Sequence, residues 1–485
     1  MHVISGGAKR SKFAALGMRV KLSCLIIVFS FLIWGTADAQ SHIDSLAKPD
    51  SLVVKKDSLF KHEDIAHQGH DTVVVKKDSI YRRALAQFDA TTISITNEAV
   101  RAYGSPMTFS ALLQETNGAY PLIQTDQGYG RESFEFTNRT SEPLASSFLE
   151  GVLPLNDPLT GNTDLNYFPL EIASVTSIES GGKLSSADHA SSDAINFTLE
   201  KFRAPIPYSR FHYTQELGNA LSNFEGLFSI NTSDALNLAV AAYHRSAGTN
   251  NNPSDLTFNP RLDQWWVRSQ MTYTTAKVDA LLFLLYRSAF NGMNGGILAR
   301  DSTTDIFDPQ LSTVRDPKPF DHRTRLDALG QIALSVFSEK ERTLLSAYAT
   351  TAARHLLGRD STFADYAYDI LRGERYGISL LQPATLHIGE FITRATLRGD
   401  GQYLTRGAFG AYLPAVSEAR FSAMASDSLS LSGAFGLSVS GYLRETISQL
   451  SLNSNSEPQL LFTNFGLEAS AKLTEALKIT ARADY

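Results

Sequence analysis

From about residue 201 to its end, the chain consists of short segments in which apolar residues alternate with polar or small ones. In the segment ALNLAVAAYHR, for example, Leu236, Leu238 and Val240 fall on one face of an extended chain. A period of two residues is the pattern of a β-strand with one apolar face. Because such segments of about ten residues follow one another to the end, they predict a transmembrane β-barrel of about fourteen strands.

The connections between these segments are short at one end and long at the other. Short turns are expected at Thr274–Lys277, Ser338–Glu341 and Thr474–Glu475, and long connections at residues 246–262, 291–320 and 443–458. Outer-membrane barrels have short periplasmic turns and longer extracellular loops, and the asymmetry fits that arrangement.

Four aromatic residues lie near the ends of the expected strands: Trp265, Trp266, Tyr273 and Tyr286. They suit an aromatic girdle at the lipid–water interface. The alternative is that they pack in the core of a soluble β-protein.

The N-terminus carries one long apolar run, residues 22–35, which follows basic residues and precedes the small residues Ala37 and Ala39. This is the pattern of a secretory signal peptide, so residues 1–39 are expected to be removed by cleavage between Ala39 and Gln40. The alternative is an N-terminal membrane anchor, for which the run is short.

Cys24 is the chain's single cysteine and lies inside that apolar run. The mature chain therefore has no thiol, which excludes disulfides, thiolate metal sites and cysteine nucleophiles. The formal net charge is −6, and removal of the basic leader makes it more negative. Nucleic acid is therefore not expected as a partner.

Residues 40–90 are rich in Ser, Asp, Lys and His and contain a repeat, DSLVVKKDSL from Asp50 and DTVVVKKDSI from Asp71. Such a composition predicts a flexible periplasmic tether. His62, His67 and His70 do not have the HExxH spacing of a zinc helix, so solvated histidines are expected there, with a loose metal site as the alternative.

Residues 91–200 have a mixed composition and predict an α+β domain. A strand is expected at residues 91–100 and a helix near residues 106–118, followed by turn-rich segments and further strands. The distinctive segments are SSFLEGVLPLND, NYFPLEIASVTSIESGGK and DAINFTLEKF. Their candidate motif residues are Leu149, Glu150, Gly151, Pro154, Leu155, Asn156, Asp157, Pro169, Glu171, Glu179, Gly181 and Asn196.

The order and spacing of these segments resemble the plug domain of TonB-dependent outer-membrane receptors. The resemblance covers about a hundred residues and implies an all-β transmembrane barrel, residues 201–485, whose lumen contains the plug domain, residues 91–200. Three positions depart from the family pattern. Glu150 stands where the family has Asp, Asn138-Arg139-Thr140 stands where the family has Arg-Gly after a strand, and Ser180-Gly181-Gly182 stands in place of Arg-Gly-Pro. A small soluble α+β domain is the alternative for this region.

The resemblance also implies a TonB box, a short segment that pairs as an extra strand with a TonB-type energy-transducing protein. The candidate residues are Asp71, Thr72, Val73, Val74 and Val75. Added strands bind through main-chain hydrogen bonds, which suits a β-branched segment on a tether. The first copy of the repeat, Asp50-Ser51-Leu52-Val53-Val54, is a second candidate with a weaker match. The alternative is an inert linker repeat.

Together these features predict an active-transport receptor in the bacterial outer membrane, in contact with lipid and with a ligand that the sequence does not identify. The alternative is a passive porin-like or surface-binding barrel without energy coupling. Because fourteen strands would leave little room for a plug, an incomplete barrel is expected, with a complete smaller barrel as the rival. No cofactor is expected, and no enzyme, since His244, His322 and His355 occur without a catalytic motif.

Overall fold

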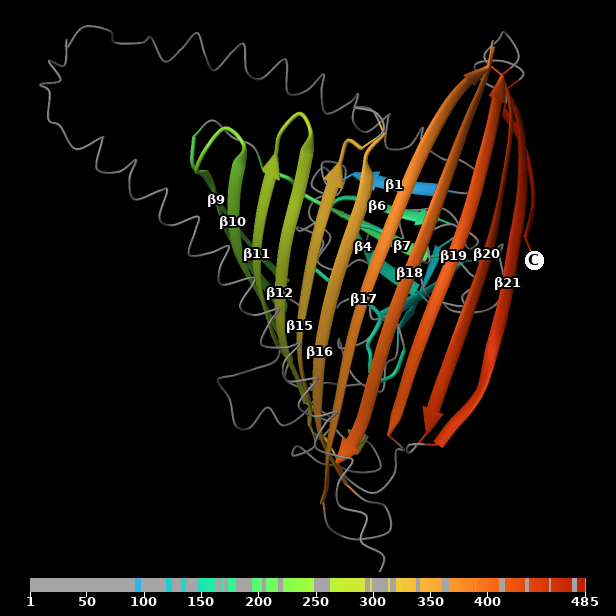
Figure 1. Cartoon of the computed structure of the whole chain (residues 1–485). Coiled ribbons are helices and arrows are strands. Elements are labelled where there is room, and N and C mark those ends of the chain that lie inside the picture. The colour runs from blue at the N-terminus through green and yellow to red at the C-terminus, as the bar shows by residue number, and fades with distance from the viewer. Residues whose placement is uncertain are drawn as a thin grey trace, which may run out of the picture. The chain divides into compact units, whose positions relative to one another are not determined.

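The computed structural model in Figure 1 describes most of the chain beyond residue 145 and several short segments before it. All of the described residues lie in one compact unit, His70–Tyr485. The described ranges are 92–96, 119–123, 132–136, 146–161, 168–169, 173–179, 194–202, 206–216, 221–247, 262–292, 297–298, 313–314, 320–336, 341–359, 366–388, 390–409, 415–431, 436–452, 455–472 and 478–484. The expected signal peptide, tether, TonB box and the helix near residues 106–118 lie outside these ranges.

The largest element is an antiparallel sheet that has thirteen strands in the described residues, against about fourteen expected. We call this sheet the wall. Its strands follow chain order, so β8 and β22 stand at its two ends. The strands are β8 (Tyr208–Glu216), β9 (Leu221–Asn231), β10 (Leu236–Ala247), β11 (Leu262–Thr274), β12 (Val278–Gly292), β15 (Phe320–Leu334), β16 (Thr343–Arg359), β17 (Tyr366–Ile388), β18 (Phe391–Phe409), β19 (Val416–Leu431), β20 (Gly436–Leu452), β21 (Asn455–Lys472) and β22 (Lys478–Asp484). Between β12 and β15, β13 (Ile297–Leu298) pairs with β14 (Thr313–Val314).

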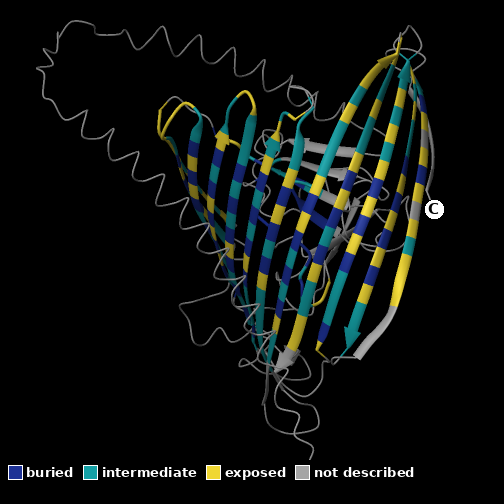
Figure 2. Cartoon of the chain, viewed as in Figure 1, coloured by how far each residue is buried: buried dark blue, intermediate teal, exposed yellow. Residues whose placement is uncertain are grey.

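The two faces of the wall have opposite polarity, as the alternating colours of Figure 2 show. The outer face carries exposed apolar side chains such as Ile378, Phe421 and Leu461, which are 63–66% exposed. The inner face buries polar and charged side chains, among them Arg268 and Asp327, both 0% exposed. A soluble sheet buries its apolar face, so this inverted pattern is that of a wall facing lipid.

The connections of the wall confirm two of the three expected long connections. β11 ends at Thr274 and β12 begins at Val278, which confirms the short turn expected at Thr274–Lys277. The two longest connections of the wall are residues 248–261 and 293–319. The expected long connection at residues 443–458 is wrong, because β20 continues to Leu452 and β21 begins at Asn455. Its Ser- and Asn-rich composition was misleading, since polar residues can extend a hairpin beyond the apolar part of a sheet.

Three of the four residues expected in an aromatic girdle lie on the face of the wall that a girdle requires. Trp265, Tyr273 and Tyr286 lie on the outer face and are 42–45% exposed. Trp266 is only 1% exposed because consecutive strand residues point to opposite faces, so it belongs to the inner face.

A second, smaller sheet is built from the residues of the expected plug. It has five strands in the order β1 (Thr92–Thr96), β6 (Ala173–Glu179), β7 (Ala194–Leu199), β4 (Ser146–Leu149) and β5 (Leu153–Pro154). β4 and β7 run parallel, and the other pairs are antiparallel. A separate hairpin of β2 (Ala119–Ile123) and β3 (Glu132–Phe136) follows the expected helix, in a stretch for which the sequence predicted a loop.

One apolar core joins the small sheet to the inner face of the wall. Leu149, Leu153 and Phe197 from the small sheet share a buried cluster with wall residues such as Trp266 and Phe283. All five are at most 2% exposed, and Phe197 also packs on Phe168 with ring centroids 4.8 Å apart. The small sheet is therefore packed against the wall.

No helix in the described part of the chain is long and apolar enough to cross a membrane.

The polarity of the wall leads to a prediction for folding into a bilayer. Ile378→Lys, on the outer face of β17, should lower the free energy of folding into lipid vesicles by about 2–4 kcal/mol, because it places a cation in hydrocarbon. Ser233→Lys, in an exposed turn, is the matched control and should change little. Urea titration of vesicle-folded protein measures both values. Equal stabilities for the two variants would contradict a lipid-facing outer surface.

Candidate functional site

The candidate site lies where the β4–β5 hairpin meets the wall. We use "the hairpin" for residues 146–161. Its tight turn is formed by Glu150 and Gly151, whose φ angles are 52° and 67°, and the Val152 N–H donates to the Leu149 carbonyl at 3.1 Å. Two successive positive φ angles define a type I′ turn, a conformation that glycine adopts freely and glutamate adopts at a cost.

The side chain of Glu150 has a structural partner that accounts for its place in this turn. Its Oε1 accepts a hydrogen bond from the Leu199 N–H at 2.6 Å, and its own N–H donates to the Phe197 carbonyl at 2.8 Å. The Gly151 N–H donates to Oδ1 of Asn196 at 2.7 Å. Three residues of the expected motif thus tie the turn to β7.

Asn156 and Asp157 fix the chain that follows the turn. Oδ1 of Asn156 accepts from the Ser147 N–H at 2.9 Å, and its Nδ2 donates to the Gly161 carbonyl at 3.1 Å. Oδ1 of Asp157 accepts from the Leu159 N–H at 2.9 Å. These side chains give the loop after β5 a fixed shape, which leaves the carbonyls of Leu155, Asn156 and Leu159 to accept hydrogen bonds from outside the loop.

The wall holds this loop through arginine side chains. Nη1 of Arg325 donates to the carbonyls of Leu155 and Asn156 at 2.7 and 3.1 Å, and Nη2 donates to the carbonyl of Pro154 at 2.9 Å. Oδ1 of Asp327 accepts from Nε and Nη2 of the same guanidinium at 3.0 and 2.9 Å. One buried arginine therefore binds three consecutive carbonyls while an aspartate on its own strand orients it.

Three further arginines bind the hairpin in the same way. Arg375 donates to the Asn156 carbonyl at 3.3 Å, Arg398 to that of Gly151 at 2.7 Å, and Arg406 to that of Leu159 at 3.2 Å. We call Arg325, Arg375, Arg398 and Arg406 the arginine clamp. Since the acceptors of these hydrogen bonds are main-chain carbonyls, the clamp binds the backbone of the hairpin and not the side chains of the hairpin.

A second ionic cluster lies beside the clamp. Asp321 accepts hydrogen bonds from Arg323 at 2.5 and 2.9 Å and from Arg354 at 2.8 and 3.0 Å. Arg323 and Arg354 are directly opposite each other on β15 and β16, so the shared carboxylate offsets their repulsion.

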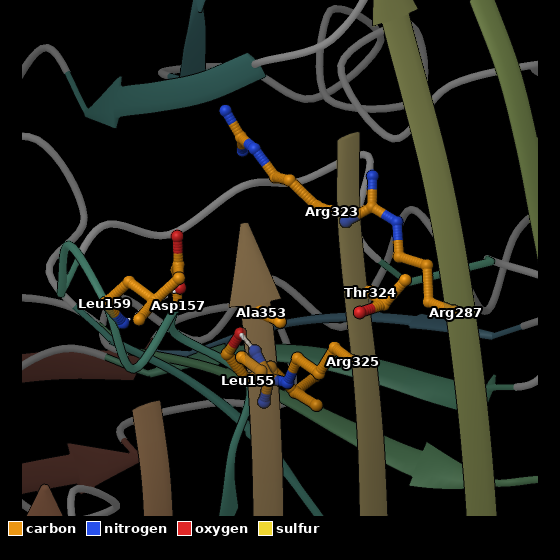
Figure 3. Close-up of a pocket in the computed structure, with 9 residues that line it drawn as sticks. Leu155, Asp157, Leu159, Arg287, Arg323, Thr324, Arg325 and Ala353 are labelled. Atoms are coloured by element: carbon orange, nitrogen blue, oxygen red, sulfur yellow. Dashed lines mark hydrogen bonds between the residues drawn. The ribbon is translucent and has the colours of Figure 1, made fainter. Parts of the chain in front are cut away.

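A cavity separates part of the hairpin from the wall, and Figure 3 shows the side chains around it. Its volume is about 410 Å³, including the solvent space at its mouth. Arg287, Arg323 and Arg325 line it from the wall, and Leu155, Asp157 and Leu159 line it from the hairpin. The guanidinium of Arg287 also lies 5.5 Å from the centre of the Trp266 ring. The site thus combines a fixed loop, a cationic wall and a space between them.

The structure brings most of the expected motif residues together. The hairpin contains Leu149, Glu150, Gly151, Pro154, Leu155, Asn156 and Asp157, and Asn196 contacts its turn. Pro169 is buried in the chain before β6. Glu179 lies at the end of β6, opposite Thr92 and Ala194. Glu171 and Gly181 lie outside the described residues.

The arginines of the wall were not predicted as site residues from the sequence. A usable signal was present: opposite charges separated by one residue, as in Arg325-Leu326-Asp327 and Arg398-Gly399-Asp400. Residues two apart on a strand share a face. Such pairs inside an otherwise apolar alternation indicate a charged inner face.

The three histidines without a catalytic motif, His244, His322 and His355, have partners in the structure. Nε2 of His244 lies 3.0 Å from Oδ1 of Asp263, and its ring stacks on Trp265. Nε2 of His322 lies 3.1 Å from Oγ of Ser288, and its ring centre is 6.1 Å from that of His355.

These contacts lie on the outer face of the wall. In the described residues, the ring of His322 lies against Ser288, Phe290 and His355. The same residues contain no group of three or more His, Cys, Asp or Glu side chains placed to hold a metal ion.

The fold and the site together define a class of protein. A meandering antiparallel wall, apolar outside and charged inside, with a small domain clamped to its inner face, is the architecture of a plugged outer-membrane β-barrel. Solved structures that resemble the chain include TonB-dependent outer-membrane receptors, and the chain has their fold.

Three of these structures show the extent of the similarity. The ferric-catecholate import receptor Fiu of E. coli K12, in an open form, has a TM-score of 0.60 and 11% identity, over 81% of this chain and 69% of its own. The ferric citrate transporter FecA, unliganded, has a TM-score of 0.62 and 12% identity, over 81% and 62%. The Serratia marcescens hemophore receptor HasR, in complex with HasA and heme, has a TM-score of 0.62 and 13% identity, over 81% and 63%.

The chain therefore spans about two thirds of the length of these receptors. No family model matches the sequence, and no curated protein does.

The arginine clamp leads to a stability prediction. Arg325→Gln leaves Asp327 buried without its arginine and removes donors from three carbonyls, so the hairpin should be less stable by about 3–5 kcal/mol. Arg420→Gln is the matched control, because Arg420 also lies on the inner face and binds a carboxylate two residues away, Glu418, at 2.7 Å. Pulse proteolysis in urea, read at cleavage sites within the hairpin, measures the difference. Similar cleavage midpoints for both variants would contradict the clamp.

Glu150 leads to a pH prediction. Burial raises the pKa of its carboxyl group above the ordinary value, and the hydrogen bond from Leu199 and the charge of Lys201 offset only part of that rise. Between the ordinary and the raised pKa the folded protein binds a proton that the unfolded chain has released, so stability falls as pH rises through that window. Glu150→Gln should remove this decline. Urea midpoints measured from acid to neutral pH test it, and identical pH profiles for variant and parent would count against the burial of this carboxyl group.

Proposed function

We propose that the chain is an outer-membrane active-transport receptor that binds a ligand at the extracellular side and imports it past the plug, driven by a TonB-type protein. The observation that carries this proposal is the arginine clamp, which attaches a folded domain to the inner face of a lipid-facing wall. A simple pore has no use for such a domain. The similar structures, an import receptor for ferric catecholates and a transporter for ferric citrate, support a role in import.

The connections of the wall support an orientation for the receptor. Residues 248–261 and 293–319 join strands at the end opposite the short turns, and long loops of outer-membrane barrels face the outside. The cavity is lined by Arg287 and Arg323, which lie near the ends of β12 and β15 that lead into the longer loop. Ligand is therefore expected to enter from the loop end.

The free energy needed to release the hairpin from the arginine clamp supports the need for an external driving force. Its four arginines make six hydrogen bonds to hairpin carbonyls within the described residues. Hydrogen bonds to charged groups contribute about 1.5–3 kcal/mol each, so releasing the hairpin costs on the order of 10 kcal/mol. Spontaneous release would then be rare, and an external pull would be required.

The candidate TonB contact is Asp71–Val75, upstream of the small sheet, whose first strand begins at Thr92. A β-branched segment there could add as a strand to a partner sheet, as main-chain pairing needs no particular side chains. Protein partners at the outer surface are also consistent with the fold, since the similar receptor HasR binds the hemophore HasA and FpvAI binds pyocin S2.

Removal of the TonB contact tests the proposal. An exported variant lacking residues 71–75 should bind ligand as the parent does and import none, because binding does not use the tether and import does. Deletion of five residues from the other repeat copy, 50–54, is the matched control. Uptake into whole cells and binding to isolated outer membranes are measured separately.

The outcomes separate the proposal from a passive barrel. Import that continues after deletion of 71–75, or in cells without TonB or without a proton gradient, would establish the passive alternative. Loss of import in both deletions would assign the effect to tether length and overturn the role of Asp71–Val75.

A further inference from the structure

Two histidine side chains lie directly opposite each other on the outer face of the wall. His322, the third residue of β15, is the cross-strand partner of His355 on β16. Their ring centres are 6.1 Å apart, and both residues are half-buried. The small sheet packs on the other face of the wall, so this pair is separate from the hairpin, the arginine clamp and the cavity.

The distance between the two rings suits a shared metal ion. A Zn²⁺ ion lies about 2.0–2.1 Å from the histidine nitrogen that binds it. Two imidazoles on one ion therefore have ring centres about 5 Å apart in tetrahedral geometry and about 6.4 Å apart when they lie on opposite sides of the ion. The observed 6.1 Å falls between these limits, so small side-chain rotations bring both rings onto one ion.

His322 is held in place through one of its two ring nitrogens. Its Nε2 lies 3.1 Å from Oγ of Ser288, which projects from β12 on the same face of the wall. A histidine that binds a metal through one nitrogen usually has a hydrogen-bonded partner at the other, and that partner fixes the orientation of the ring. Nδ1 of His322 is therefore the nitrogen that would bind the ion.

Two apolar rings border the histidine pair. The ring centre of Phe290 lies 6.3 Å from that of His322 and 5.4 Å from that of Phe320. An apolar border limits the access of water to a metal site. β15 begins at Phe320, so the pair lies near the strand end that follows the long connection, where an ion in solution can reach it.

We propose that His322 and His355 bind a divalent cation of the class that prefers imidazole ligands, such as Zn²⁺ or Cu²⁺. Mg²⁺ and Ca²⁺ prefer oxygen ligands and would not bind there. Within the described ranges no third His, Cys, Asp or Glu completes a metal-binding group, so water fills the remaining positions around the ion. The ion would link β15 to β16 on the face turned away from the plug, and the site does not depend on the proposed import function.

Equilibrium dialysis of the purified, detergent-solubilised mature chain against Zn²⁺ measures this site. The tether histidines His62, His67 and His70 are first replaced by asparagine, so that they do not add to the signal. We expect saturable binding of one Zn²⁺ ion per chain, reversed by EDTA. Mg²⁺ should show no saturable binding.

Substitutions in the same background assign the binding to the pair. His322→Asn and His355→Asn should each abolish saturable binding, because a single imidazole holds the ion weakly. His387→Asn, at an exposed position near the end of β17, is the matched control and should leave the affinity unchanged. Ser288→Ala should weaken the affinity about 10–100-fold, the usual effect of losing a partner that orients a metal ligand.

A second measurement requires no substitution at the site. Because an ion that binds only the folded chain stabilises it, Zn²⁺ should raise the urea midpoint of unfolding, and Mg²⁺ should not. No saturable Zn²⁺ binding, or equal affinities in His322→Asn, His355→Asn and His387→Asn, would overturn the inference. An unchanged urea midpoint at saturating Zn²⁺ would overturn it as well. Neither measurement involves TonB or an imported ligand, so its failure is distinct from a failure of the import proposal.

Discussion

The contact between wall arginines and hairpin carbonyls is the interaction on which the arrangement of the two sheets depends. Arg325 is the clearest example of this contact. Asp327 on the same strand orients its guanidinium, which donates to three consecutive carbonyls of the hairpin. Arg398 repeats the arrangement with Asp400 and the carbonyl of Gly151. An oriented donor loses less side-chain entropy when it binds, so each aspartate makes its arginine a better clamp.

The same alternation of residues serves both faces of the wall. Leu326 lies between Arg325 and Asp327 and is 44% exposed on the outer face, while its two neighbours are at most 6% exposed on the inner face. The outer residues can face lipid because every second residue is apolar. The buried charges of Arg325 and Arg398 are tolerated because an aspartate on the same strand and the hairpin carbonyls bind them. The small sheet thus supplies hydrogen-bond acceptors to the wall as well as packing against its inner face.

Period-two alternation was enough to predict the antiparallel wall, its short turn at Thr274–Lys277 and two long connections. The motif around Glu150 and Gly151 predicted a turn, and the structure shows the type I′ geometry that it requires. Two features could not be predicted. The strand ends at Leu452 and Asn455 lie in polar sequence that resembles a loop, and the clamp joins residues about 170–250 positions apart, which no local pattern encodes. Inner-face arginines were visible in the sequence, but their carbonyl partners were not.

The most direct test of the account is a disulfide between the hairpin and the wall. A side chain added at Gly373 on β17 would lie within 2.9 Å of the Leu159 side chain, and the expected mature chain has no other cysteine. Leu159→Cys combined with Gly373→Cys, oxidised in isolated outer membranes, should form a cross-link that changes electrophoretic mobility and is reversed by reductant. Leu159→Cys combined with Ile378→Cys, on the outer face of the same strand, should form none. Failure of the first pair to cross-link, or equal cross-linking of both pairs, would contradict a hairpin clamped to the inner face of the wall.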